Sequence, residues 1–190
     1  MLQTLRSIRF SSNAAPGLKV FDRNLKLLQR NRAASDPDFK YGQYLKDEVS
    51  KKTIERLSYL KVPFDNVLDF GSHAGNFEKV LCEERWDERD PTWKEDRLIV
   101  KNKIGKILMV DSSEGMLFKD MESRFNKDLQ VDRIVADEEE FNIPELTGEN
   151  QYDLIISNLS LHWINDLPQS FKNLYKCLKP DGCFIGSMFG

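Results

Sequence analysis

Short apolar runs alternate with helical patterns from residue 66 onward. Buried strands are predicted at residues 66–70, 106–110, 133–136, 152–157 and 183–188. Helices are predicted between them at residues 75–84, 114–125 and 168–178. Because buried strands joined by helices form a parallel sheet covered on both faces, the pattern predicts a doubly wound α/β fold with a mostly parallel sheet.

Two further helices are predicted before the sheet. Residues 21–32 form a short basic helical pattern that ends at Ser35-Asp36-Pro37, and residues 44–60 carry leucines and a valine on roughly one side before Pro63. We therefore expect N-terminal helices over residues 21–65 and the main domain over residues 66–190.

The segment 83–103 interrupts this alternation. It packs thirteen charged residues into twenty-one and contains Pro91. Such a composition buries too little apolar surface for a core, so it predicts a solvated loop insertion. A docking arm that carries Trp86 and Trp93 is the alternative interpretation.

The first twenty residues have a different composition. They contain Arg6, Arg9, Lys19 and several serines but no acidic residue, which is typical of a mitochondrial transit peptide. The sequence Arg9-Phe10-Ser11-Ser12 also resembles a matrix-protease cleavage site. We expect residues 1–20 to be a transit peptide and disordered N-terminus, and a frayed basic terminus of a cytosolic protein is the alternative.

Composition limits the remaining classes of function. The 190 residues are 40% hydrophobic and 31% charged, which is typical of a globular domain. The net charge of −3, without a basic stripe, argues against a nucleic-acid partner. No apolar run is long enough to span a membrane, so any membrane contact is expected to be peripheral. Three cysteines without Cys-x-x-Cys spacing predict neither a disulfide framework nor a zinc site.

A glycine-containing turn, from Asp69 through Gly71 and His73 to Gly75, joins the first strand to its helix. In a doubly wound sheet this turn lies at the switch point where ligands bind, and glycine lets the backbone approach a ligand closely. Alone the turn is a weak signal, because any strand–helix unit can carry two glycines.

Acidic residues after the next strands strengthen the signal. Asp111 ends the second strand 111 − 71 = 40 residues after Gly71, or 19 once the 21-residue insertion is subtracted. That is close to the ~20 residues expected for a ribose-binding carboxylate. Asp137 and Glu138 follow the third strand, where they could bind an adenine amino group or simply form a solvated acidic turn. Because three strands in a row end in acidic residues at the same edge of the sheet, we favour a nucleotide-binding site over a solvated acidic turn.

These residues carry a resemblance to a known family. The Asp69-x-Gly71 turn, the acids above, and residues 152–155 (YDLI) and 178–182 (LKPDG) resemble the motifs of class I S-adenosylmethionine (SAM)-dependent methyltransferases. Residues 21–26, 136–139, 184–190 and, most specifically, 157–168 (SNLSLHWINDLP) resemble the mitochondrial methyltransferase-like assembly factors of respiratory complex I, which are arginine hydroxylases. The resemblance covers about residues 20–190 apart from the insertion.

The resemblance implies a Rossmann-like fold, SAM as cofactor, and hydroxylation of an arginine in the quinone-site iron–sulfur subunit of the complex I matrix arm. It also implies other assembly factors as partners, at the matrix side of the inner membrane. The residues implied to hold SAM are Asp69, Gly71, His73, Gly75, Asp111, Ser112, Asp137, Glu138, Asn158 and Leu159. The residues implied to be catalytic, at the substrate mouth, are Asn158, His162 and Trp163, and no metal ligands are implied.

The chain departs from the family at His73, where the family has a third glycine. An imidazole where the backbone should approach the ligand is expected to reduce or alter cofactor affinity, unless the ring turns outward. His73 and His162 end neighbouring strands, but an iron site of two histidines and one carboxylate lacks a carboxylate at ligand spacing.

Two other functions are compatible with these residues: a SAM-dependent O-methyltransferase for a small acid or a carrier-bound acyl group, and a non-catalytic assembly chaperone. The class I sheet normally continues after its fifth strand with a helix and two more strands. We therefore expect a fold truncated after strand five, whose apolar edge is exposed.

Overall fold

The computed structural model describes residues 19–84, 90 and 92–189. Its five strands form one sheet in the order β3-β2-β1-β4-β5, and every neighbouring pair is parallel. The strands are β1 Phe64–Phe70, β2 Ile104–Asp111, β3 Gln130–Val135, β4 Tyr152–Asn158 and β5 Leu178–Ser187. The order reverses direction between β1 and β4, so the predicted doubly wound sheet is confirmed.

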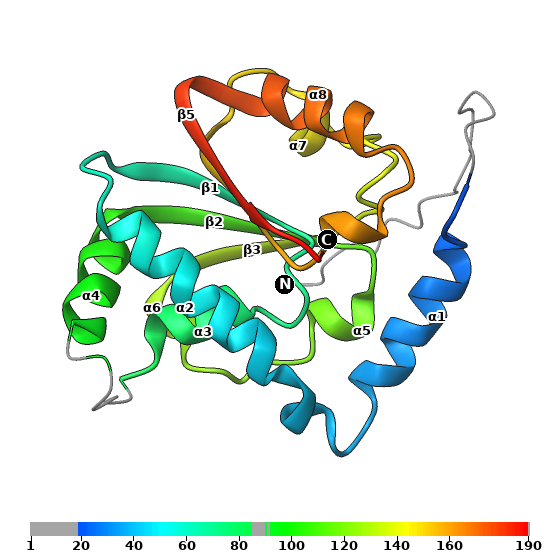
Figure 1. Ribbon diagram of the computed structural model, residues 1–190, viewed down its shortest axis with the longest axis horizontal. Coiled ribbons are helices and arrows are strands. Elements are labelled where there is room, and N and C mark those ends of the chain that lie inside the picture. Colours follow the sequence, from blue (N-terminus) through cyan, green and yellow to red (C-terminus); the bar gives the residue numbers. More distant parts are fainter. Residues whose placement is uncertain (1–18, 85–89, 91, 190) are drawn as a thin grey trace, which may run out of the picture.

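Helices cover both faces of the sheet (Figure 1). One face packs against α2 Tyr44–Ser58, α3 Asn76–Cys82 and α4 Trp93–Lys103, and the other against α7 Pro144–Thr147 and α8 Leu167–Cys177. Successive strand residues point to opposite faces. Val67 and Ile107 therefore join the first core, whereas Leu68 and Leu108 join the second.

The helix α4 corrects the prediction of a solvated loop over residues 83–103. Trp93, Arg97 and Val100 are buried at helical spacing of four and three residues, and they face α2 and α3. The Arg97 guanidinium donates one hydrogen bond, from Nη1 to the Leu81 carbonyl oxygen, at 3.1 Å. The high charge content of the segment obscured the narrow buried side of this helix in the sequence. Trp86 lies outside the described residues.

The single helix predicted over residues 114–125 is also wrong. Two short helices, α5 Glu114–Leu117 and α6 Phe125–Asp128, replace it. The Asn126 side chain of α6 donates to carbonyl oxygens of the segment between the two helices, those of Asp120, Met121 and Ser123, at 2.9, 3.0 and 3.1 Å. These bonds hold a turn that a continuous helix would not allow.

The helix α1 Arg23–Ala34 lies beside the carboxyl ends of the strands (Figure 1). Asp22 caps it by accepting a hydrogen bond from the Leu25 amide at 3.0 Å. A 3-10 helix at Phe39–Gln43 leads from α1 to α2, and a second at Leu161–Trp163 follows β4. The chain thus returns from α1 to the sheet through α2.

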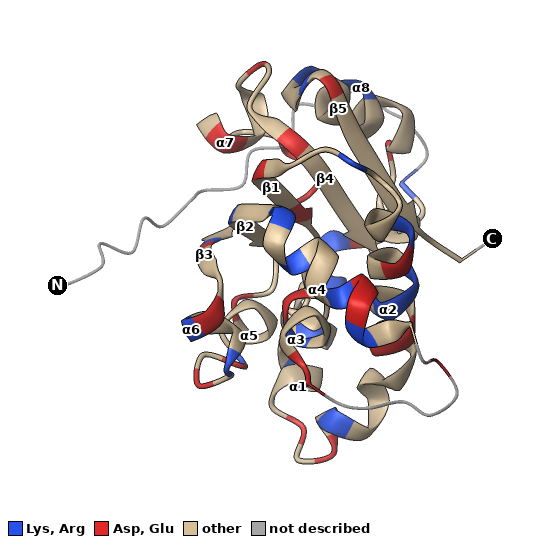
Figure 2. Cartoon of the chain, turned by 90° about the vertical axis from the view of Figure 1, so that its left-hand side faces the viewer, with Lys and Arg blue, Asp and Glu red and all other residues tan. Residues whose placement is uncertain are grey.

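Charge is mixed over the surface. Figure 2 shows acidic and basic residues intermixed along α2. Among the described residues, no helix combines the length and the apolar character needed to cross a bilayer. Residues 1–18, which hold nearly all of the predicted transit peptide, lie outside the described part of the chain.

Candidate functional site

The turn after β1 is built around two glycines with left-handed backbone. Gly71 has φ 76° and Gly75 has φ 78°. The amides of Gly71 and Ser72 both donate to the Val110 carbonyl oxygen, at 2.8 and 3.0 Å, so the turn is fixed to the end of β2. A Cβ on Gly71 would overlap the Ser160 hydroxyl. The close packing therefore requires glycine at position 71.

His73 lies in the same turn with its imidazole turned inward. Its side chain is buried, its φ is 54°, and its Nδ1 lies 3.0 Å from Arg30 Nη2 while Nε2 lies 3.2 Å from the Asn158 carbonyl oxygen. Burial, together with the charges of Lys46 and Arg30, holds the pKa of His73 well below its usual value. The ring is therefore neutral, and the outward orientation considered above is wrong.

Asp111 ends β2 as a fully buried carboxylate. Its oxygens accept hydrogen bonds from the amides of His73 and Ser113 at 2.9 and 2.8 Å and pair with the Arg30 guanidinium. Burial raises the pKa of Asp111 to about 6, and Arg30 opposes that rise. Arg30 Nη1 also lies 3.5 Å from the Ser112 hydroxyl. The predicted ribose carboxylate is thus ionised at neutral pH and held by α1.

The two acids after β3 are held by the same helix. Arg23 pairs with Asp137 at 2.8 Å and also contacts Glu138, and Arg30 Nη1 lies 3.4 Å from Glu138 Oε1. Although burial alone would raise it, Arg30 and Arg23 hold the pKa of Glu138 below its usual value. The structure therefore brings the three predicted adenosine acids together, each paired with an arginine of α1.

Asn158 ends β4 beside the turn. Its Oδ1 accepts hydrogen bonds from the hydroxyls of Thr53 at 3.0 Å and Ser187 at 3.3 Å, whereas its Nδ2 is buried without a partner among the described residues. Leu159 follows with φ 53°, and its amide donates to the Ser187 carbonyl oxygen at 2.8 Å. One amide donor at the end of β4 is therefore available to a ligand.

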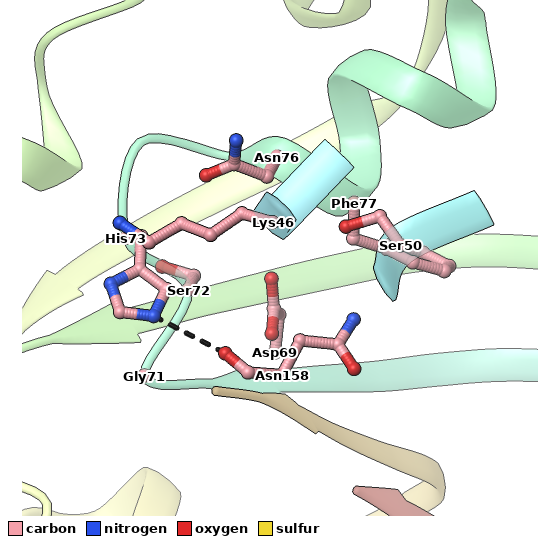
Figure 3. A pocket seen from close by; sticks show the side chains of 9 residues that line it. All are labelled: Lys46, Ser50, Asp69, Gly71, Ser72, His73, Asn76, Phe77 and Asn158. Carbon is pink, nitrogen blue, oxygen red and sulfur yellow. Dashed lines mark hydrogen bonds between the residues drawn. The ribbon is translucent and has the colours of Figure 1, made fainter. Parts of the chain in front are cut away.

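A small cavity lies between α2 and the ends of β1 and β4 (Figure 3). The polar atoms that line it without a hydrogen-bond partner in the described chain are Ser50 Oγ, Ser72 Oγ, Asn76 Oδ1 and Asn158 Nδ2. Native proteins leave few buried polar atoms unpaired, and such atoms call for an explanation. The cavity therefore offers four polar atoms with which a ligand could form hydrogen bonds.

A second carboxyl group, Glu78, lies close to Asp69 but does not line the cavity. Both are buried. Burial and the charge of Glu78 raise the pKa of Asp69 well above its usual value, and burial raises the pKa of Glu78 to about 7. Two buried carboxyl groups this close do not both ionise readily, so the pair retains a proton near neutral pH.

His162 and Trp163 lie away from this cavity and do not line it. The Trp163 ring packs edge-on against Phe21 with centroids 5.3 Å apart, and Lys26 Nζ lies 3.2 Å from its centroid. The His162 ring lies 5.0 Å from the Phe189 ring. Of the three residues predicted to be catalytic, only Asn158 lines the cavity. In the described chain, no group of three His, Cys, Asp or Glu residues could hold a metal ion.

Two sets of residues were missed by the sequence reasoning. Arg23 and Arg30 are seven residues apart, so one side of α1 presents both to the acidic edge. Lys46, Ser50 and Leu57 recur at four- and seven-residue spacing on α2. A lysine and a serine on the same side as a buried leucine could have indicated a polar site under that helix.

Comparison with known proteins places the chain in a family. Residues 41–190 match the family model of a methyltransferase domain, and the chain belongs to this family. It is 35% identical over 185 residues to mitochondrial arginine-hydroxylase NDUFAF5 of Rattus norvegicus, a match that covers 97% of this chain and 46% of the relative. It is also 42% identical over 124 residues to a malonyl-acyl-carrier-protein O-methyltransferase of Priestia megaterium, covering 65% of this chain and 36% of the relative.

A solved structure shares the fold at lower identity. Phosphoethanolamine N-methyltransferase 1 of Haemonchus contortus, crystallised with S-adenosylhomocysteine, matches 87% of this chain and 32% of its own with a TM-score of 0.62 and 17% identity. The chain spans about half the length of the arginine-hydroxylase relatives it matches. Their names confirm the resemblance predicted from residues 157–168.

Proposed function

We propose that this chain is the SAM-binding methyltransferase domain of an arginine hydroxylase that acts in the assembly of mitochondrial complex I. The observation that carries the proposal is the 35% identity to arginine-hydroxylase NDUFAF5 over 97% of the chain. The site supports it, because glycines and buried acids meet where a parallel sheet of this order binds nucleotides.

The residues at the carboxyl edge fit SAM. Asp111 would accept hydrogen bonds from the ribose hydroxyls, and Asp137 with Glu138 would face the adenine. The unpaired Nδ2 of Asn158 and hydroxyl of Ser72 would face the amino-acid end. When bound, SAM would supply a positively charged sulfonium centre.

Binding of the adenosine end of SAM requires the Arg30 side chain of α1 to move away from the acidic residues. Arg30 contacts both Asp111 and Glu138, so its guanidinium occupies the place where the ribose and the adenine would bind. The ribose hydroxyls would therefore replace the guanidinium at Asp111. The loss of an ion pair would be offset by the new hydrogen bonds and by the cation released to water.

The proposal also covers the substrate of the protein, its partners and its location in the cell. The substrate is an arginine of the quinone-site iron–sulfur subunit, and other assembly factors are partners. The protein works at the matrix side of the inner membrane, in peripheral contact with it. The relatives are named as mitochondrial proteins, which supports the mitochondrion as the compartment.

Mass spectrometry of the iron–sulfur subunit tests the proposed reaction. In cells that lack this protein we expect the target arginine without the added oxygen atom, and re-expression should restore it. An arginine that still carries the oxygen in the deletion cells would contradict the proposal.

An O-methyltransferase is the second candidate, favoured by the 42% identity over 124 residues to the malonyl-acyl-carrier-protein enzyme. The two functions differ in product mass, by one methylene group against one oxygen atom. Incubation with SAM and a malonyl carrier protein should give no methyl ester if the hydroxylase proposal holds.

A further inference from the structure

We propose that the Trp163 ring is the surface on which the guanidinium group of the substrate arginine binds, and that Lys26 of α1 occupies this surface in the ligand-free chain. The inference rests on the proposed arginine-hydroxylase function and deepens it. It assigns the recognition of the substrate to a ring that lies outside the cavity described above.

The first observation is a cation that already lies on the face of the Trp163 ring. Lys26 Nζ is 3.2 Å from the ring centroid, and Lys26 has no carboxylate partner among the described residues. The face of an aromatic ring attracts cations, and tryptophan attracts them most strongly. The position of Lys26 therefore marks a ring face that a cation from another chain could occupy in its place.

The second observation is that neighbouring groups hold the Trp163 ring in place. Phe21 packs edge-on against it, with centroids 5.3 Å apart, and the His162 ring lies 4.7 Å away. The Trp163 carbonyl oxygen also accepts a hydrogen bond from Arg23 Nη1 at 3.3 Å. Because these contacts order the ring before a ligand arrives, binding to it costs less conformational entropy.

The third observation is an unpaired nitrogen beside the ring. His162 Nδ1 is buried and has no hydrogen-bond partner in the part of the chain that the structure describes. Burial and the charge of Lys26 lower the pKa of His162, so the imidazole is neutral at pH 7 and one of its nitrogens can accept a hydrogen bond. A guanidinium group is a flat cation that stacks on aromatic rings and donates N–H groups from its edge. It could therefore contact the indole and bond to the imidazole together, whereas Lys26 contacts only the indole.

The fourth observation is the negative charge around Trp163. Arg23, which donates to the Trp163 carbonyl oxygen, also pairs with Asp137 at 2.8 Å. Glu139 Oε1 accepts a hydrogen bond from the side chain of Asn165 at 3.0 Å. Carboxylates close to the ring attract a cation and repel an anion, so the surroundings favour a positively charged ligand.

NMR titration of the 190-residue chain with two peptides tests the proposal. One is acetyl-glycyl-arginyl-glycinamide, and the other carries citrulline, which has the shape of arginine without its charge. We expect the arginine peptide to shift the indole N–H signal of Trp163, which is assigned by its loss in Trp163→Leu. The citrulline peptide should bind about fivefold more weakly or less, because it lacks the attraction between a cation and the ring.

A second variant separates ligand recognition from folding. Lys26→Met removes the competing ammonium group, so it should bind the arginine peptide about two- to tenfold more tightly than the unmodified chain does. A misfolded variant would not show such a gain in affinity. Lys40→Met is the matched control, because the exposed Lys40 ammonium group also lies over a ring, 5.0 Å from the Tyr41 centroid, and its removal should leave the affinity unchanged.

Three outcomes overturn the proposal and leave the proposed function in place. They are an unshifted Trp163 signal at millimolar arginine peptide, equal binding of the arginine and citrulline peptides, and an unchanged affinity in Lys26→Met. The mass spectrometry of deletion cells described above tests the function separately. An arginine that keeps its oxygen in those cells would remove the hydroxylase function, and with it the substrate assigned to the Trp163 ring, even if the ring binds the peptide.

Discussion

His73 shows how one residue sets the shape of this site. A glycine at that position would leave open space beside the cavity, whereas the imidazole links Arg30 of α1 to the Asn158 carbonyl oxygen at the end of β4. The residue also holds a left-handed φ of 54°, which is costly for a side chain with a Cβ. The substitution therefore closes the site and stores backbone strain in it.

We expect His73→Gly to tighten S-adenosylhomocysteine binding about three- to tenfold, because removing the buried ring opens space for the ligand in the turn. Isothermal titration measures the affinity, and circular dichroism checks that the variant folds. Weaker binding by the variant would show that the imidazole contacts the ligand, contrary to this expectation.

Glu78 predicts a pH dependence of stability. Its folded pKa of about 7 lies above the ordinary 4.5, so the folded state binds more protons between these values. Stability therefore falls as pH rises from about 4.5 to 7, by up to about 3 kcal/mol, and that loss is complete above pH 7. Glu78→Gln should remove this contribution.

Urea denaturation at pH 5 and pH 8 measures the effect. The free energy of unfolding should fall less between these two pH values in Glu78→Gln than in the unmodified chain. Glu48→Gln, on the exposed side of α2, serves as the matched control and should behave like the unmodified chain. An identical fall in all three proteins would show that Glu78 is already ionised at pH 5.

At the scale of elements, α1 and α4 each have a structural role that their amino-acid composition does not reveal. The basic helix α1 neutralises the acidic edge of the sheet, since Arg23 and Arg30 pair with acids after β2 and β3. The highly charged α4 contributes Trp93 and Val100 to the core. In both helices, the neighbours in the folded structure determine which charged residues form ion pairs and which apolar residues are buried.

Removal of Arg30 should destabilise the chain and make it more responsive to ligand. Arg30→Gln leaves Asp111 and Glu138 buried with less compensation, which costs about 3 kcal/mol and lowers the melting temperature. Because the ribose no longer competes with a guanidinium, S-adenosylhomocysteine should raise the melting temperature more than in the unmodified chain. Arg32→Gln on the exposed side of α1 should match the unmodified chain, and a smaller ligand response in Arg30→Gln would contradict competition.

The role of α4 in the core can be measured with two neighbouring residues. Val100→Ala should lower the free energy of unfolding by about 2 kcal/mol, because the fully buried side chain leaves a cavity. Ile99→Ala, whose side chain is 42% exposed, should change it by less than about 0.5 kcal/mol. Equal small effects would show that α4 does not stabilise the fold.

At the scale of the whole molecule, local patterns predicted what depends on local sequence. All five strands and the turn at Gly71 follow from apolar runs and glycine spacing, and Asp111 was found because it ends a strand. Arg30 could not be found in this way, since its pairing with Asp111 depends on how α1 crosses the edge of the sheet. His162 and Trp163 were named from a sequence string, and the packing of Trp163 against Phe21 is a tertiary contact that no string shows.

The position of β4 beside β1 has a consequence for how the protein folds. These central strands pair Val67 with Leu154 and are separated by β2, β3 and their helices, so a long stretch of chain must be closed before they meet. Late closure of distant contacts is slow compared with helix formation. The cavity needs residues from both strands, so it is complete only once this long-range pairing has formed, and a ligand that binds only the completed cavity would slow unfolding more than it speeds folding.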